Sequence, residues 1–102
     1  MLPTKGALMI RSFADEAADA CFRGEPVAGT GWQQVQRVAR RKLLMVNAAA
    51  ELKDLARPPN NRLEALKGDR AGQHSIRVND QWRICFVWKD DGAHGVEIVD
   101  YH

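Results

Sequence analysis

The chain has 102 residues, a formal net charge of +2 and 45% hydrophobic side chains. This composition allows one modest core, so it predicts a single globular domain and excludes a long disordered tail. Cys21 and Cys85 lie far apart without the spacing of metal ligands, which disfavours a zinc site. We expect both to be small buried residues and not a disulfide, as suits a reducing cytoplasm. Residues 1–8 lack the apolar stretch of a signal peptide, and no apolar run is long enough to span a bilayer. We therefore expect a cytoplasmic protein with no metal and no cofactor.

The beginning of the chain predicts a short strand and a short helix. Residues 9–13 alternate apolar and polar side chains, which is typical of a strand. Asp15 and Glu16 then place acidic groups at the N-terminus of a helix that continues to Phe22. Three glycines and a proline in residues 24–31 predict a connecting loop.

The clearest helix follows this loop. Thr30 and Gln33 have the spacing of a capping box at its start. The helix should fade near residues 47–50, followed by a helical turn that ends before the proline pair at residues 58–59. An apolar stripe recurs at steps of three and four residues, formed by Trp32, Val35, Ala39, Leu43 and Val46.

From Asn60 onward the pattern changes from helical to alternating, which predicts a sheet. Three strands are expected at residues 74–79, at residues 82–89 and from Val96 into the C-terminus, and residues 63–66 can add an edge strand. The turns between them are polar, so the strands should form an antiparallel meander. The fold class is therefore α+β, with two N-terminal helices packed on one face of a small antiparallel sheet and the other face left for function.

Residues in the second half suit cleavage of a phosphodiester bond without a metal ion. The 2′-hydroxyl of RNA can attack the adjacent phosphorus if a base takes its proton, a cation stabilises the phosphorane and an acid protonates the leaving oxygen. Glu64 can serve as the base, Arg83 or Lys67 as the charge stabiliser and His102 as the acid. Each also has a structural interpretation, because a strand glutamate is usually exposed, Arg83 alternates away from its apolar neighbours and a terminal residue often frays.

Basic residues gather in two parts of the chain. Such clusters neutralise phosphates and gain affinity through counterion release. Lys42 also belongs to the first cluster, and Arg83 to the second. A solvated helix face explains the first cluster equally well. The residues expected to contact RNA or the ribosome are Arg37, Arg40 and Arg41 in the first cluster, and Lys67, Arg70 and Arg77 in the second.

Four segments carry a resemblance to a known family, and they are residues 9–13, 62–70, 79–84 and 99–102. The order and spacing of Leu-Lys-Gly-Asp-Arg and of the terminal Asp-Tyr-His make the match specific. These segments are similar to the HigB family of the RelE/ParE toxin superfamily, from type II toxin–antitoxin systems. The resemblance predicts one toxin domain over residues 9–102, preceded by an extension of unknown role at residues 1–8.

The resemblance implies a RelE-like microbial ribonuclease fold and a ribosome-dependent endoribonuclease that cleaves translated mRNA and so inhibits growth. It implies neutralisation by a helix-turn-helix HigA antitoxin, with operator DNA bound only through that complex and no membrane contact. Asp100, Tyr101 and His102 match catalytic positions of HigB toxins. Glu64 departs from a HigB branch that has histidine there and resembles the YoeB toxins, whose arginine and histidine match Arg83 and His102. The identity of the general base therefore stays open.

Two alternatives belong to other functional classes. ParE relatives share the fold but poison DNA gyrase by binding, and they lack the glutamate, arginine and terminal histidine that this chain has. An antitoxin-binding remnant with weak activity would serve mainly in repression of its own operon. A ribosome-programmed cleavage assay separates these three possibilities.

Overall fold

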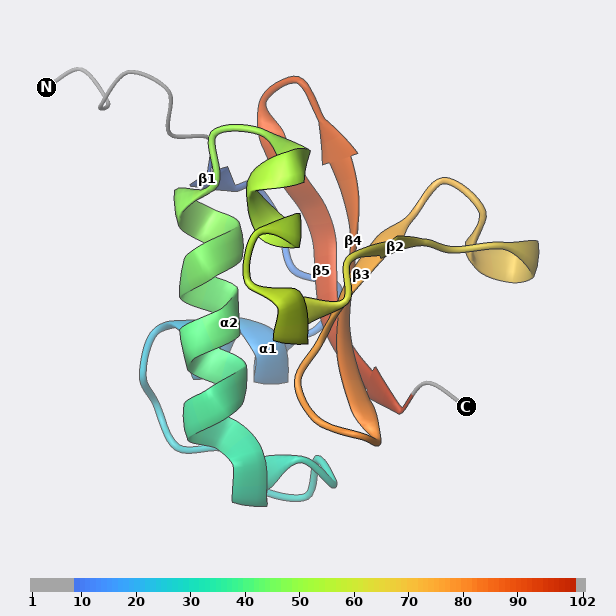
Figure 1. Cartoon of the computed structure of the whole chain (residues 1–102). Coiled ribbons are helices and arrows are strands. Elements are labelled where there is room, and N and C mark those ends of the chain that lie inside the picture. The colour runs from blue at the N-terminus through green and yellow to red at the C-terminus, as the bar shows by residue number, and fades with distance from the viewer. Residues whose placement is uncertain (1–8, 101–102) are drawn as a thin grey trace, which may run out of the picture.

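A five-stranded sheet in the order β1-β5-β4-β3-β2 forms the centre of the computed structural model, which describes residues 9–100 (Figure 1). The last four strands pair antiparallel, as predicted, whereas β1 adds a parallel edge beside β5 that was not predicted. The predicted α+β class is confirmed. The strands are β1 (Met9–Ile10), β2 (Glu64–Ala65), β3 (His74–Arg77), β4 (Trp82–Lys89) and β5 (Gly92–Asp100).

The parallel edge depends on Gly92, the first residue of β5. A β-carbon at Gly92 would lie 2.0 Å from the carbonyl oxygen of Met9, and Gly92 has a φ of +129°. Only glycine therefore lets β1 approach this closely. The predicted strand at residues 9–13 ends at Ile10, and beyond it Phe13 makes only an isolated bridge with Val96.

The C-terminal end of β3 also differs from the prediction, because the Asn79 side chain forms a turn there. The strand predicted to reach Asn79 ends at Arg77. The Oδ1 atom of Asn79 accepts hydrogen bonds from the backbone N–H groups of Gln81, at 2.9 Å, and Trp82, at 2.7 Å. Asn79 thus closes the turn between β3 and β4 instead of continuing the ladder.

Both predicted helices form. Helix α1 (Glu16–Phe22) is capped by Asp15, whose carboxylate accepts from the backbone N–H of Ala18 at 2.8 Å. The 3₁₀ turn η1 (Gln33–Val35) leads into α2 (Gln36–Ala48). The predicted capping box is wrong, because Trp32 is the N-cap of η1 and makes no side-chain cap; the Gln33 side chain instead accepts from the backbone N–H of Gly31.

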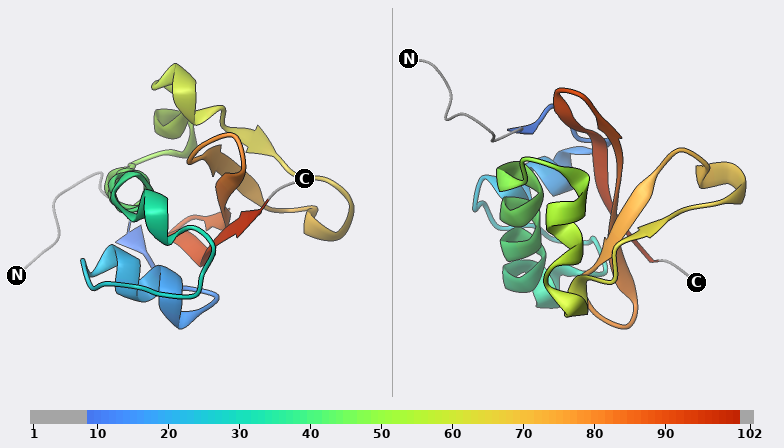
Figure 2. Two further views of the ribbon diagram at one scale, coloured as in Figure 1. Left: turned by 90° about the horizontal axis from the view of Figure 1, so that it is seen from below. Right: turned by 45° about the horizontal axis from the view of Figure 1, so that its top comes forward.

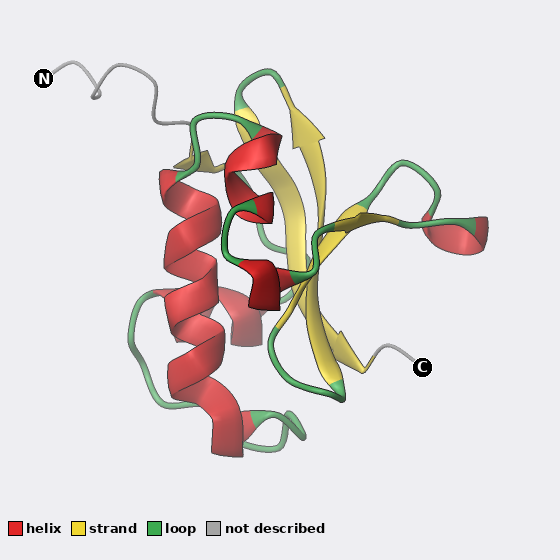
Figure 3. Ribbon diagram, in the orientation of Figure 1, coloured by secondary structure: helices red, strands yellow, loops and turns green. Residues whose placement is uncertain are grey.

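The helices cover one face of the sheet and bury the core against it (Figures 2 and 3). Full burial of an aliphatic or aromatic side chain contributes roughly 1.5–3 kcal/mol to stability. No helix within residues 9–100 is long and apolar enough to cross a bilayer. The largest fully buried apolar side chains of this core are Leu43, Val46, Leu55, Ile76, Ile84, Phe86 and Val96.

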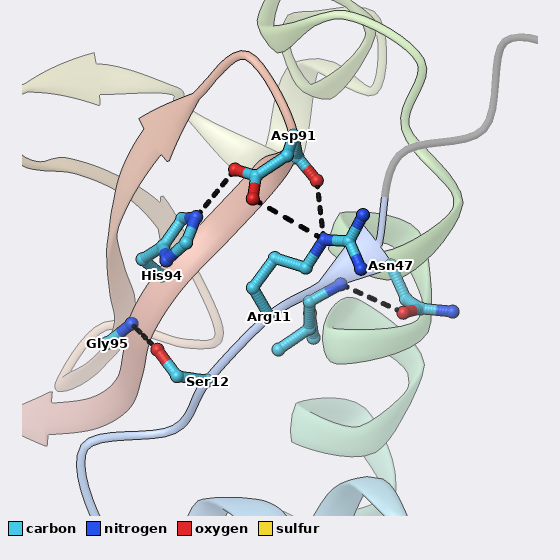
Figure 4. A network of polar contacts seen from close by, with 7 residues as sticks. Arg11, Ser12, Asn47, Asp91, His94 and Gly95 are labelled. Carbon is cyan, nitrogen blue, oxygen red and sulfur yellow. Dashed lines mark hydrogen bonds and ion pairs between the residues drawn. The ribbon is translucent and has the colours of Figure 1, made fainter.

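A polar network fastens β1 to the β4–β5 hairpin and to α2 (Figure 4). Arg11 donates its Nε–H to the carbonyl oxygen of Asp91 at 2.8 Å, and the Asp91 carboxylate lies 2.7 Å from Nε2 of His94. On the other side, the backbone N–H of Ile10 donates to Oδ1 of Asn47 at 3.0 Å. These contacts hold β1 in place, because a strand of only two residues makes few ladder hydrogen bonds of its own.

Lys42 is buried, which corrects its place in the predicted surface cluster. Its side chain donates to Oδ1 of Asn61, and Nδ2 of Asn61 donates to the carbonyl oxygen of Leu55 at 3.1 Å. Burial lowers the pKa of the Lys42 ammonium. This network ties α2 to the two 3₁₀ turns η2 (Leu52–Ala56) and η3 (Pro59–Asn61), and so fixes the approach to β2.

Candidate active site

The face of the sheet that the helices leave open carries a row of four polar residues in register. Glu64 on β2 pairs with Ser75 on β3, Ser75 with Cys85 on β4, and Cys85 with Glu97 on β5. Ser75 and Cys85 are fully buried in the middle of the row, with a carboxylate at each end. Burial raises the pKa of the Cys85 thiol, so it is protonated at neutral pH and acts as a packing residue.

Arg83 lies across one end of this row and is held by several acceptors. Its Nε donates to Oγ of Ser75 at 2.7 Å, and its Nη2 donates to the carbonyl oxygen of Arg62 at 2.6 Å. Nη2 also lies 3.5 Å from Oε1 of Glu64. The Arg83 side chain is only 11% exposed, whereas that of Glu64 is 48% exposed. The structure thus brings together a solvent-facing carboxylate and a fixed guanidinium, which are two of the predicted catalytic groups.

Arg70 covers the other end of the row. Its Nη2 atom lies 2.9 Å from Oε1 of Glu97, and its Nη1 donates to Oε1 of Gln73 at 3.0 Å. Arg70 ends the 3₁₀ turn η4 (Gly68–Arg70), and the exposed Lys67 precedes this turn. The segment that contains η4 projects from the sheet beyond β2 (Figure 1). Lys67 and Arg70 therefore belong to an arm beside the row.

Arg77 extends the basic character of the open face. It pairs with Arg83 in the ladder between β3 and β4, so strand alternation puts both side chains on the same face. Its guanidinium forms an ion pair with Asp80 in the following turn. Arg70, Arg77 and Arg83 each lie within ion-pair distance of a carboxylate, so the open face carries several N–H donors whose charge is partly neutralised.

The first basic cluster does not reach this site. Arg37, Arg40 and Arg41 are exposed on α2, in the helix layer on the other side of the sheet. Arg40 donates its Nε–H to the carbonyl oxygen of Phe22 at 3.2 Å. None of the three forms an ion pair with another residue in the range 9–100. They form a separate basic surface on α2.

Comparison with protein families shows which family the chain belongs to. The family of RelE-like toxins of the type II toxin–antitoxin system HigB matches residues 11–102. The chain belongs to this HigB-like toxin family. It is 35% identical to the endoribonuclease HigB of Proteus vulgaris over 94 residues, which are 92% of this chain and all of that protein.

Two other relatives match a shorter stretch of this HigB-like toxin. Toxin HigB-1 of Vibrio cholerae serotype O1 is 45% identical over 59 residues, which are 58% of this chain and 62% of the relative. An uncharacterized protein of Haemophilus influenzae is 38% identical over 60 residues, which are 59% of each chain. The aligned stretch thus spans about three fifths of the length of these two relatives. A type II toxin implies a cognate antitoxin as partner.

The C-terminal residues of the predicted site are only partly described. Asp100 ends β5 and pairs with Trp82, one residue out of step with the Arg83–Val99 pair. Alternation therefore places Asp100 on the side of Trp82, where its Oδ2 atom accepts from Nε2 of Gln81 at 2.9 Å. Tyr101 and His102 lie outside the described residues, so their catalytic roles stay predictions.

The sequence interpretation missed Ser75, Glu97 and the carbonyl group of Arg62. The hairpin register contained a signal for Ser75, because the polar turn at residues 79–80 aligns β3 with β4 and brings this serine within reach of Arg83. The other two depend on contacts between distant segments. Among residues 9–100, no three histidine, cysteine or acidic side chains converge in a way that could hold a metal ion.

Proposed function

We propose that this HigB-family toxin, an endoribonuclease like its Proteus relative, cuts mRNA while it is translated on the ribosome and thereby stops growth. The observation that carries the proposal is the pairing of exposed Glu64 with the fixed guanidinium of Arg83 on the open face. A carboxylate beside an aimed cation suits removal of a proton from the 2′-hydroxyl and stabilisation of the charge that follows. Ribosomes are the site of action, so we place the toxin in the cytoplasm.

The proposed reaction divides its steps among the predicted residues. Glu64 takes the proton of the 2′-hydroxyl, whose oxygen attacks the adjacent phosphorus. Arg83 or Lys67 neutralises the additional negative charge of the phosphorane. His102 gives a proton to the 5′-oxygen as the phosphorus–oxygen bond breaks, leaving a 2′,3′-cyclic phosphate. Asp100 and Tyr101 orient this histidine, and the reaction uses no metal ion or other cofactor.

In this proposal one basic surface binds the mRNA strand and another binds ribosomal RNA. Arg77 on the open face, together with Lys67 and Arg70 on the arm beside the row, would hold the phosphates of the mRNA strand. The arginines on α2 lie on the other side of the sheet and would contact the backbone of ribosomal RNA. This second set consists of Arg37, Arg40 and Arg41.

The cognate antitoxin is proposed to be a helix-turn-helix protein of the HigA type. Its gene should lie beside that of the toxin, and operator DNA should be bound only through the toxin–antitoxin complex. Co-expression of the neighbouring reading frame should relieve growth arrest. If arrest persists when the two proteins are produced together, the assignment of that partner is wrong.

A ribosome-programmed cleavage assay tests the activity. The parent should cut mRNA on translating ribosomes, and Arg83→Ala should cut it at a rate reduced by about a hundredfold or more. Lys53→Ala is the control, because this exposed lysine lies on η2, away from the open face. Intact mRNA together with inhibited DNA gyrase would instead support a ParE-like poison, and very slow cutting by the parent would support an antitoxin-binding remnant.

A further inference from the structure

We infer that Ser75 is a positioning residue that aims the guanidinium of Arg83, acting together with the carbonyl group of Arg62. This inference rests on the proposed ribonuclease activity and adds residues to its site. Both residues hold Arg83 and do not themselves meet the reacting phosphate. Between them they present three acceptors to this one arginine on the open face.

Ser75 presents two acceptors to the same side chain. Its Oγ atom accepts from Nε of Arg83 at 2.7 Å, and its carbonyl oxygen accepts from Nη2 at 3.4 Å. Ser75 is fully buried in the central part of the sheet. A buried hydroxyl is unfavourable there unless it is hydrogen-bonded, and Arg83 supplies that hydrogen bond. The hydroxyl therefore has a specific partner in the candidate site.

Arg62, at the C-terminal end of η3, supplies a further acceptor for the Arg83 guanidinium. It is the only non-glycine residue in the range 9–100 with a positive φ, at +46°. Such a conformation is disfavoured for a side chain with a β-carbon and persists only where its surroundings enforce it. Here the buried pair of Lys42 and Asn61 fixes the preceding turn, and the Arg62 carbonyl oxygen accepts from Nη2 of Arg83 at 2.6 Å.

These acceptors restrict a flexible side chain before the substrate arrives. A free arginine samples many rotamers, whereas a guanidinium bonded through both Nε and Nη2 keeps its plane and direction. Charge stabilisation of a phosphorane depends on donors that are already aimed at the developing charge. Loss of the Ser75 hydroxyl should therefore slow the chemical step and leave ribosome binding unchanged.

A double-mutant cycle under single-turnover conditions tests this inference, with Ser75→Ala, Arg83→Lys and both changes together. Lysine lacks the planar fork that Ser75 holds, so the two changes should be coupled. Ser75→Ala alone should lower the maximal cleavage rate roughly tenfold without changing the half-saturating ribosome concentration. In the Arg83→Lys background the same change should cost less than about twofold. Melting temperatures of all variants show that they are folded.

The control is Ser12→Ala, which removes the hydroxyl of the only other serine. That hydroxyl accepts from the backbone N–H of Gly95 at 2.8 Å (Figure 4). Gly95 precedes Val99, the β5 residue that pairs with Arg83, by four residues. Parental cleavage by Ser75→Ala, or an equal loss with and without Arg83, would overturn the inference. Failure of the proposed function is distinguishable, because the parent itself would then leave ribosome-bound mRNA uncut.

Discussion

The two basic regions of this toxin differ in how their arginines are held. On the open face, Arg83 is 11% exposed and bonded to Ser75 and Arg62, and Arg70 is paired with Glu97. On α2, Arg37 and Arg41 are exposed and have no ion pair within residues 9–100. The same residue type therefore occurs as a fixed donor in one place and as a solvated charge in the other.

Arginines held in one direction suit chemistry, and solvated arginines suit binding. A fixed guanidinium delivers its donors in one direction, as stabilisation of a transition state requires. A solvated arginine adapts to many phosphate positions and contributes chiefly through salt-dependent electrostatics. Variants of the fixed Arg83 should thus change the cleavage rate, whereas variants of the exposed Lys67 and of the arginines on α2 should change affinity.

The largest effect is expected for His102, which lies outside the described residues. Deletion of His102, or His102→Gln, should lower the cleavage rate by about a hundred- to ten-thousandfold, because it removes the proposed general acid. Antitoxin binding should stay near that of the parent, and so should thermal stability, since one terminal side chain buries little apolar surface. The measurement compares cleavage rate with melting temperature. Full activity in a folded deletion variant would remove His102 from the mechanism, and loss of folding would make its role structural.

A smaller effect, on affinity, is expected for the exposed basic residues of both regions. Lys67→Ala should weaken association with RNA in a salt-dependent way, making the negative slope of log affinity against log salt less steep by about 0.7 for a single-stranded contact. A combined change of Arg37 and Arg41 to alanine should weaken ribosome binding at low salt and leave the cleavage rate at saturation intact. Binding across a salt series, with Lys53→Ala as control, measures both. Parental slopes would show that these side chains are only solvated surface.

A third prediction concerns the support of the open face. Asn61→Ala should lower the free energy of unfolding by about 2–3 kcal/mol, because it removes the acceptor of buried Lys42 and the donor to Leu55. Chemical denaturation measures this loss. Asn60→Ala, at the exposed neighbouring position, is the control. If Asn61→Ala is as stable as the parent, the buried pair does not hold the turn before Arg62.

The smallest effect is expected at the far end of the sheet. The hydrogen bond with His94 lowers the pKa of Asp91, so ionised Asp91 stabilises the fold above its ordinary pKa. This contribution is lost as the pH falls through the lowered value. His94→Gln should move the Asp91 pKa back up without changing cleavage, as measured by NMR titration of the carboxyl group. An unchanged Asp91 pKa would show that the histidine is not the cause.

Local patterns predicted much of the fold, whereas contacts between distant segments escaped prediction. Strand β4 and helix α1 were predicted within a residue of their bounds, because alternation and the Asp15 cap act within a few residues. Burial of Lys42 was missed because its partner Asn61 is 19 residues away. The parallel edge depends likewise on Gly92 meeting Met9 across the length of the chain.

The same limit applied to the candidate site. Glu64 and Arg83 were singled out by their chemistry and their family positions, and the structure brings them within 3.5 Å of each other. The residues that hold Arg83 carried no chemical signature of their own. A serine in a strand is ordinary, and the positive φ of Arg62 is invisible in the sequence because that conformation is usually adopted by glycine.

If the toxin cleaves RNA by attack of the 2′-hydroxyl without a metal ion, the chemical ends of its products will carry the signature of that reaction. Mass spectrometry of mRNA cut on the ribosome reads these ends, and it avoids chelation, which would disturb the ribosome's own magnesium. We predict that the upstream fragment ends in a 2′,3′-cyclic phosphate or a 3′-phosphate. A 3′-hydroxyl end would contradict the mechanism assigned to Glu64, Arg83 and His102.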